Sequence, residues 1–351
     1  MTAIHKTHLR PYPASWANWL ISRWDALGVW FWLPYFGLFV SLALAQTLAK
    51  WWDGSLATGQ FLYLQILAAS YIPWGLLLIR YLIRAALEAL ETIRPTLGPS
   101  ETDYQELRYQ LSVAPALATL AATLVGAGFG SIYWLIVMRP VHPYILWGSS
   151  RLSLAIDLGV ALLIWAVLGA LFFIALRQSR IIQHIYTRIE QINLMLPQPL
   201  YALSNYTLVA AVGGTLINYV WFVVVSLTIA HSPPAITAVS LGLEAMIVVV
   251  FVLPLWSIHI LLLDEKRRLQ GLLNERLQKA IADLHRSVDE GLLERIDPVQ
   301  KALSGIQIQQ AVLDRASTWP WQPETFRILS TAIAAPLLIW LVQRVLSRLF
   351  S

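Results

Sequence analysis

Seven long apolar segments with few charged residues constrain this chain more than any other feature. About 20 consecutive apolar residues are enough to cross the hydrocarbon core of a bilayer as a helix. Backbone polar groups in lipid must be paired within the segment, and a helix achieves this. We therefore expect an all-α membrane protein with seven transmembrane helices. The predicted spans are Val29–Ala49, Gly59–Ile83, Val113–Met138, Ser153–Leu176, Asn205–Ala230, Ala235–Leu263 and Thr325–Leu346.

Composition supports the membrane assignment and excludes several classes of site. Hydrophobic residues make up 57% of the chain and charged residues only 13%, whereas about 25% is usual for soluble domains. The chain has no cysteine, so it has no disulfide and no thiolate metal site. His5 and His8 lie in a polar tail and do not indicate a metal site. We expect no metal, no cofactor and no nucleic-acid partner.

The distribution of Lys and Arg predicts the orientation in the membrane. All but five of the 25 basic residues lie in segments 1–28, 80–112, 177–204 and 264–327. Short basic loops stay on the cytoplasmic side, so we expect a cytoplasmic N-terminus and an external C-terminus in a cell membrane, as in the inner membrane of a prokaryote. The predicted parts are a cytoplasmic segment 1–28, six spans within 29–263, a cytoplasmic helical hairpin 264–324, and the seventh span with a short external tail at 325–351.

The sixth span is predicted to continue beyond the membrane as one arm of that hairpin. No helix breaker follows Pro254, and leucines recur from Leu269 onward at helical spacing. Gly291 allows a turn, and Asp297 with Pro298 predicts the start of a returning helix, with Asp297 as its N-cap. The predicted returning helix is Val299–Ala316.

Four polar residues in or near the predicted spans are candidates for a functional site, because such groups are costly in lipid. They are Glu244, Asn218, Asp157 and His259. Glu244 and Asn218 would lie on a pathway or in a ligand pocket; alternatively, neighbouring helices satisfy them. If Asp157 has only a structural role, we expect it to pair with Arg151 or Arg139.

Two glycine pairs within the spans predict close helix packing. The stretch "GAGFGS" from Gly126 to Ser131 lies inside the third predicted span with no strand before it, so it is not a dinucleotide-binding loop. Gly126 and Gly130 have the small-xxx-small spacing that brings helices together. Gly213 and Gly214 in the fifth span suggest the same role.

Two short stretches and the overall layout resemble known families. "LPLWSIHILLLDEKRRL" (Leu253–Leu269) and "STWPWQPETFR" (Ser317–Arg327) resemble segments of uncharacterised bacterial and archaeal multi-pass membrane proteins, and that resemblance implies no known activity. In layout alone the chain is similar to the seven-helix insect odorant and gustatory receptors. That similarity implies a long sixth helix and a seventh span that lines the pore of a tetrameric cation channel.

These observations favour a non-enzymatic function and leave three hypotheses. The first is a homo-oligomeric ion channel subunit in the lipid bilayer, whose seventh span lines the pore. Alternatively, the protein is a membrane sensor or scaffold that signals through its hairpin, or a transporter or membrane enzyme that uses Glu244 and Asp157. The pore-lining candidates are Thr331, Ala334, Leu338 and Gln343.

Overall fold

The computed structural model is almost entirely helical. It describes residues 12–97, 101–138, 148–186, 205–219, 234–291 and 293–319, and the single positions 324, 327, 328, 330, 331, 334, 338, 342 and 345. The structure is 87% helix, and the described residues contain no β-strand. The helices are α1 (Trp16–Asp25), α2 (Leu33–Trp52), α3 (Tyr63–Ala69), α4 (Tyr71–Leu97), α5 (Glu101–Ser112), α6 (Ala116–Tyr133), the π-helical turn η1 (Trp134–Met138), α7 (Arg151–Tyr186), α9 (Pro234–Asp289) and α10 (Leu293–Arg315). Residues 205–219 form a further helix.

Four apolar helices among the described residues are long enough to cross a membrane. They cover Leu33–Trp52, Tyr63–Pro95, Ala116–Ile136 and Arg151–Ile185, and a shorter apolar helix covers Ala238–Val249. These helices are compatible with a membrane protein and confirm the all-α class. They correspond to the first four predicted spans, with a break at Ser70 between α3 and α4 inside the second. A total of seven spans stays a prediction, because most of the seventh lies outside the described residues.

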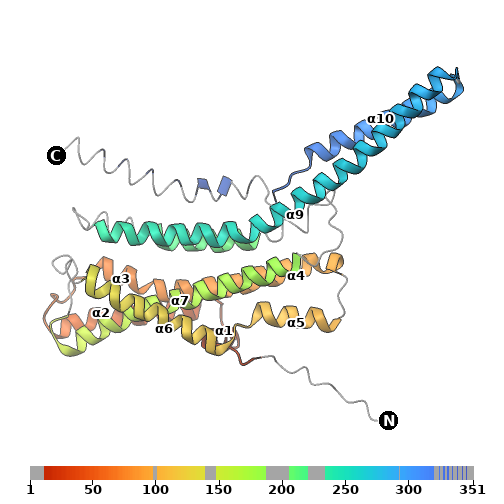
Figure 1. Cartoon of the computed structure of the whole chain (residues 1–351). Helices are drawn as coiled ribbons and strands as arrows, with labels where there is room; N and C mark the ends of the chain where they lie inside the picture. The colour runs from red at the N-terminus through yellow and green to blue at the C-terminus, as the bar shows by residue number, and fades with distance from the viewer. Residues whose placement is uncertain are drawn as a thin grey trace, which may run out of the picture.

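Helices α6 and α7 pack directly against each other, as the glycine spacing predicted (Figure 1). A Cβ atom on Gly126 would lie 2.2 Å from the carbonyl oxygen of Trp165, and one on Gly169 would lie 2.4 Å from that of Ala122. At Gly130 the Trp165 side chain fills the space, 2.5 Å from an added Cβ. The backbones therefore approach at a distance that no side chain at Gly126 or Gly169 permits.

The second glycine pair has the expected role as well. Helix 205–219 lies between α4 and α9, and a Cβ on Gly213 would come within 2.5 Å of Leu78 on α4. One on Gly214 would come within 3.0 Å of Ile247 on α9. Because α4 and α7 also pack together, these helices share one apolar core.

A short clamp holds the N-terminal segment against the joint between α5 and α6. The Ser15 N–H donates to the Ala114 carbonyl at 2.9 Å, and the Ala116 N–H donates to the Pro13 carbonyl at 3.0 Å. The Tyr12 hydroxyl, which donates to the Val113 carbonyl at 3.2 Å, also accepts a hydrogen bond from the α7 residue Arg177. Burial raises the pKa of Tyr12, so the hydroxyl stays neutral and remains a donor.

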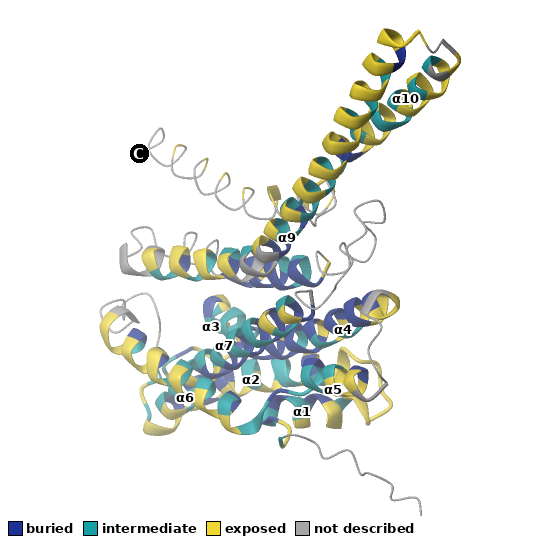
Figure 2. Cartoon of the chain, turned by 45° about the vertical axis from the view of Figure 1, so that its right-hand side comes forward, coloured by how far each residue is buried: buried dark blue, intermediate teal, exposed yellow. Residues whose placement is uncertain are grey.

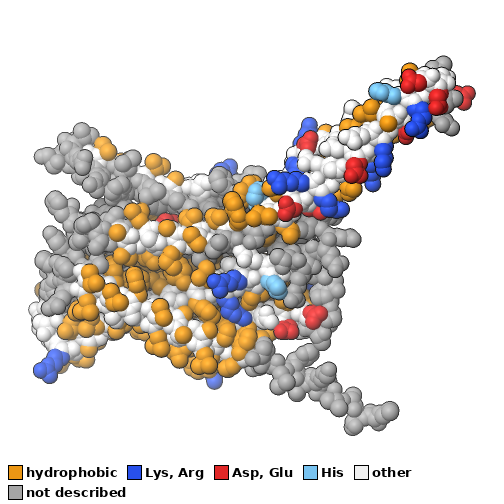
Figure 3. Space-filling model, in the orientation of Figure 1, with side chains coloured by type: hydrophobic (Ala, Val, Ile, Leu, Met, Phe, Trp, Pro, Cys, Tyr) orange, Lys and Arg blue, Asp and Glu red, His pale blue; other side chains and the backbone are white. Residues whose placement is uncertain are grey.

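Helices α9 and α10 form an arm that projects from the bundle at the same end as α5 (Figure 1). As predicted, α9 is one helix of 56 residues that runs from the bundle into the arm. It bends part-way along its length (Figure 1), and Pro254, which removes one backbone hydrogen bond, lies within it. The arm is mostly exposed (Figure 2), and Lys, Arg, Asp and Glu gather on it while apolar side chains dominate the visible face of the bundle (Figure 3).

The two arm helices are joined by a mixture of apolar and polar contacts. Leu313 of α10 is 1% exposed and Leu273 of α9 is 9% exposed. Lys266 Nζ donates to the carbonyls of Asp314 at 2.8 Å and Ala316 at 3.0 Å. The pairing is therefore specific at the base of the arm, where α10 ends.

The predicted start of the returning helix was wrong. Gly291 adopts φ +71° and reverses the chain so tightly that α10 begins at Leu293. Asp297 therefore lies inside the helix, where it forms an ion pair with Lys301 at 2.8 Å, and Pro298 is an interior residue. Pro298 lacks the N–H that an interior helical residue normally donates, so the helix continues with one backbone hydrogen bond fewer.

Candidate functional site: a buried ion pair beside a polar-lined cavity

The most unusual polar feature of the bundle is an ion pair between Lys50 and Asp157. Lys50 lies in the last turn of α2 and Asp157 in the second turn of α7. Lys50 Nζ donates to both carboxylate oxygens, at 2.6 and 2.7 Å, and each side chain is only 1% exposed. Gln46 Nε2 and the Gly148 N–H also donate to the carboxylate, each at 3.2 Å. The carboxylate thus has several donors, which offset much of the cost of burying its charge.

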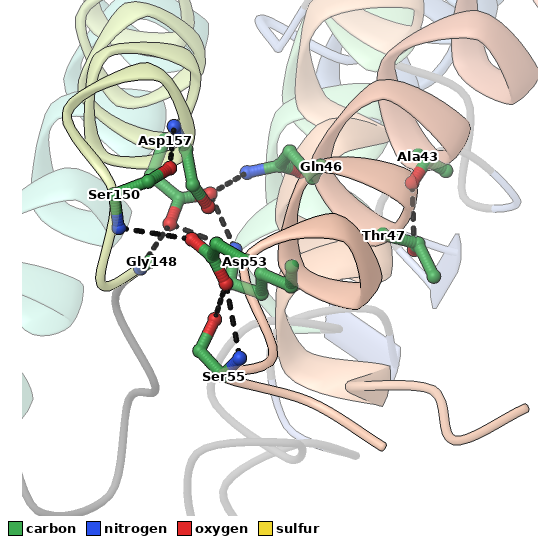
Figure 4. Close-up of polar contacts among 10 residues, drawn as sticks. Ala43, Gln46, Thr47, Asp53, Ser55, Gly148, Ser150 and Asp157 are labelled. Atoms are coloured by element: carbon green, nitrogen blue, oxygen red, sulfur yellow. Dashed lines mark hydrogen bonds and ion pairs between the residues drawn. The ribbon is translucent and has the colours of Figure 1, made fainter. Parts of the chain in front are cut away.

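Turn hydrogen bonds hold the two helix ends in the register that this pair requires (Figure 4). Asp53, which caps the C-terminus of α2, accepts the N–H of Ser150 at 3.0 Å just before α7 begins. It also accepts the Ser55 N–H at 3.0 Å and the Ser55 hydroxyl. The hydrogen bond from the Ser55 hydroxyl, with the N–H donors of Ser150 and Ser55, holds the pKa of Asp53 well below its usual range. Asp53 therefore stays ionised and ties α2 to α7 at neutral pH.

The partner of Asp157 in the described residues is Lys50 and not Arg151, one of the two partners that the sequence suggested. Arg151 lies at the first position of α7 and is exposed, and Arg139 lies outside the described residues. Lys50 reaches the carboxylate instead because α2 packs against α7 at this level. A single Lys in the last turn of an apolar helix, one turn after Gln46, was the sequence signal that could have indicated the pair.

A second polar cluster joins helix 205–219 to α9 and contains two of the other candidates. Glu244 accepts hydrogen bonds from Thr215 Oγ1 at 2.8 Å and from Asn218 Nδ2 at 3.0 Å. The same Asn218 nitrogen donates to the Ser240 carbonyl at 3.0 Å. Helix 205–219 therefore supplies hydrogen-bond donors to Glu244, which was the structural alternative to a role on a pathway. Asn218 Oδ1 is buried without a hydrogen-bond partner.

A cavity of about 130 Å³ lies between these two polar clusters. Its wall combines residues of α2, α3, α4, α6, η1, α7, helix 205–219 and α9. Its polar lining residues are Gln46, Gln65, Asp157, Asn218 and Ser240, and its aromatic ones are Tyr71, Tyr133, Trp134 and Trp165. A mostly apolar cavity with a few converging polar groups is the usual form of a small-molecule site.

The structure brings two of the four candidates, Asp157 and Asn218, to the cavity and places the other two elsewhere. Glu244 lies outside the cavity lining and accepts a hydrogen bond from Asn218. His259 lies further along α9, where its Nδ1 is 2.9 Å from the Thr318 carbonyl and its ring stacks on Trp319 at 3.9 Å between centroids. His259 thus fastens α9 to the segment that follows α10.

The pore-lining candidates lie apart from this cavity. Thr331, Ala334 and Leu338 are helical and exposed, and the Thr331 hydroxyl donates to the Arg327 carbonyl at 2.8 Å. Gln343 lies outside the described residues.

Within the described part of the chain, no group of three His, Asp or Glu side chains could hold a metal ion. Comparison with known proteins gives no further guide: no family model, curated protein or solved structure matches this chain.

Proposed function

We propose that this protein is a multi-pass membrane sensor, in which a small molecule occupies the cavity and α9 passes its effect to the arm. The observation that carries the proposal is that one continuous helix, α9, forms part of the cavity wall and also one side of the arm. Ser240 and Leu243 line the cavity, and the same helix continues to Asp289 at the tip of the arm. At 1.5 Å per residue, α9 is about 80 Å long along its axis.

The coupling follows from the contacts of α9 in the cavity wall. Asn218 bonds to the Ser240 carbonyl and to Glu244, so a ligand that engages Asn218 acts on the first turns of α9. A ligand shifts a conformational equilibrium only by its difference in affinity for the two states. Because α9 forms part of the cavity wall, a tilt or rotation of α9 changes the shape of the cavity. The ligand then has different affinities for the two positions of α9.

The experiment uses the absence of cysteine in the chain, which allows spin labels at chosen sites. Lys279→Cys on the arm and Arg108→Cys on α5 are both exposed positions, and pulsed electron paramagnetic resonance measures the distance between their labels in nanodiscs. We expect a ligand found by thermal-shift screening to change this distance by several ångströms. Ala161→Phe, which fills the cavity wall on α7, should abolish the change. A ligand that binds in the cavity and leaves the distance unchanged would refute the sensor.

An oligomeric channel is the second candidate, and one observation favours it. All nine described positions between Glu324 and Val345 are exposed in the single chain, so exposed side chains of this helical face could contact other copies of the chain. Thr331, Ala334 and Leu338 belong to it. In a channel, Leu338→Ser would wet an apolar constriction and raise conductance in reconstituted bilayers, and the purified protein would be oligomeric. A monomeric protein whose Leu338→Ser variant is electrically silent excludes the channel.

For either function we propose the orientation that the basic residues indicate, with the arm in the cytoplasm and the C-terminus outside. Topology reporters test it: one inserted at Gly291 should report the cytoplasm, and one fused after Ser351 should report the exterior. Two reporters on the same side would contradict the seven-span arrangement.

A further inference from the structure

A second hollow, of about 310 Å³, shares no lining residue with the cavity described above. Its wall is formed by one face of α4 from Trp74 to Tyr81, one face of helix 205–219 from Leu208 to Leu216, and Ile328 of the seventh predicted span. Every residue of the wall is aliphatic or aromatic except Gly213, which contributes no side chain. This hollow, called the lateral groove below, therefore has an almost entirely apolar surface.

The lateral groove runs along the axes of the two helices. The Tyr71 hydroxyl donates to the Ile217 carbonyl at 2.9 Å, and Trp74 Nε1 donates to the Gly213 carbonyl at 3.1 Å. Because later residues of α4 thus meet earlier residues of the other helix, the two helices are antiparallel and their lining stretches lie side by side. At 1.5 Å per residue these stretches are each about 10 to 12 Å long, a length and direction that suit an extended alkyl chain.

The lateral groove is open to its surroundings at the depth of the hydrocarbon core. Three of its lining residues, Trp74, Tyr81 and Leu216, are 38%, 41% and 43% exposed. The lining part of α4 lies within Tyr63–Pro95, a helical stretch long and apolar enough to cross a membrane. The bilayer at that depth consists of acyl chains. A chain that fills the groove gains dispersion contacts that an empty groove lacks.

Two arginines flank the lateral groove. Arg84 comes one turn after Tyr81 on α4, in the row of side chains at helical spacing that begins with Leu77. Arg327 directly precedes Ile328. Both arginines are exposed, and neither forms an ion pair with the described residues. Guanidinium groups without a counter-ion beside an apolar groove favour a chain that carries an anionic headgroup.

The acidic residues closest in sequence on the same helices do not neutralise these arginines. Glu88 lies one turn beyond Arg84 and Glu324 one turn before Arg327, but neither carboxylate pairs with them. Arg84 directly follows Ile83, the predicted end of the second span, so its guanidinium lies at headgroup depth. Arginine binds phosphate through paired hydrogen bonds, and anionic lipids are attracted to basic residues next to a membrane span.

We propose that the lateral groove binds an anionic phospholipid. One acyl chain lies between α4 and helix 205–219, the phosphate lies against Arg84, and Arg327 adds to the positive potential at the headgroup. Because Arg327 and Ile328 belong to the seventh predicted span, the lipid joins that span to the bundle. This lipid site is independent of the cavity and of the proposed sensor function.

The test is native mass spectrometry of the full-length protein, delipidated in detergent and titrated with two lipids that have the same chains. We expect the first dioleoyl phosphatidylglycerol to bind about tenfold more tightly than dioleoyl phosphatidylcholine. The double variant Arg84→Gln with Arg327→Gln should remove this preference. Arg151→Gln, at an exposed arginine that does not flank the groove, is the matched control and should keep it.

Val212→Trp tests the groove itself, because Val212 is part of the wall and the larger side chain occupies the space of the acyl chain. It should weaken binding of both lipids about tenfold, and its melting temperature checks that it folds. Val125→Trp, at a position of α6 that is 72% exposed, is the control and should bind both lipids normally.

Equal affinities for the two lipids in the unaltered protein would overturn the proposal, as would a preference that survives the double arginine variant. Lipid binding unchanged in a folded Val212→Trp protein would overturn it as well. A dimer that excludes lipid would show that a second copy of the chain fills the groove, which also contradicts the proposal. The arginine substitutions lie at exposed positions, so they decide the question even where Val212→Trp does not fold.

Discussion

Replacing Lys50 with Met should destabilise the protein strongly, because it leaves the Asp157 carboxylate buried without its counter-ion. Lys50 is 0% and Asp157 2% exposed, so water cannot replace the lost ammonium. Only the hydrogen bonds from Gln46 and Gly148, both at 3.2 Å, would remain. Breaking one partner of a buried pair typically costs about 3–5 kcal/mol, and we expect a loss in that range.

The assay is unfolding of the purified protein by SDS titration in mixed micelles, followed by the fluorescence of its 16 tryptophans. The double variant Lys50→Met with Asp157→Asn removes both charges, and we expect it to recover at least half of the loss. Lys279→Met, at an exposed position of the arm, is the matched control and should be nearly neutral. A loss below about 1 kcal/mol for Lys50→Met, or no recovery in the double variant, would show that an unpaired buried charge is not the cause.

Three further predictions use the same unfolding assay unless stated. Gly126→Ala should cost about 1–3 kcal/mol because a Cβ would lie 2.2 Å from a carbonyl oxygen of α7. Its control, Gly128→Ala, has nothing within 4 Å of the added Cβ and should not destabilise the protein. Equal effects of the two variants would contradict the α6–α7 contact. Leu313→Asp, at a position 1% exposed, should open the arm to limited proteolysis, whereas Ile308→Asp, at 66% exposed, should not. Asp53→Asn should destabilise the protein at pH 7. The folded pKa of Asp53 lies below its unfolded value, so its contribution is present above about pH 4 and declines at lower pH; a difference between the two proteins that grows on acidification would refute this.

Local patterns in the sequence were sufficient to predict the helices and some of their contacts. The continuation of α9 beyond the apolar stretch followed from helical spacing and the lack of a breaker, and the structure has one helix over Pro234–Asp289. The close approach at Gly126 followed from residue size. These features depend on neighbouring residues within a few turns, so the chain alone determines them.

The start of α10 was not predictable because two local signals competed. Asp297 and Pro298 form a typical helix start, but the left-handed Gly291 reverses the chain earlier. Once the chain is reversed, contacts such as that of Leu313 with α9 favour a helix beginning at Leu293. Tertiary packing then outweighs the preference of a single proline.

The cavity was decided by tertiary structure alone. Sequence reasoning selected Asp157 and Asn218 because ionisable and amide groups are costly in lipid. It did not select Lys50, whose place in an apolar helix was a signal, and it had no means of pairing Lys50 with Asp157, 107 residues away. Gln46 was missed for the same reason, since its significance depends on the carboxylate it meets. Composition determines that buried polar groups need partners, whereas the packing of helices determines which partners they reach and which atoms stay unpaired.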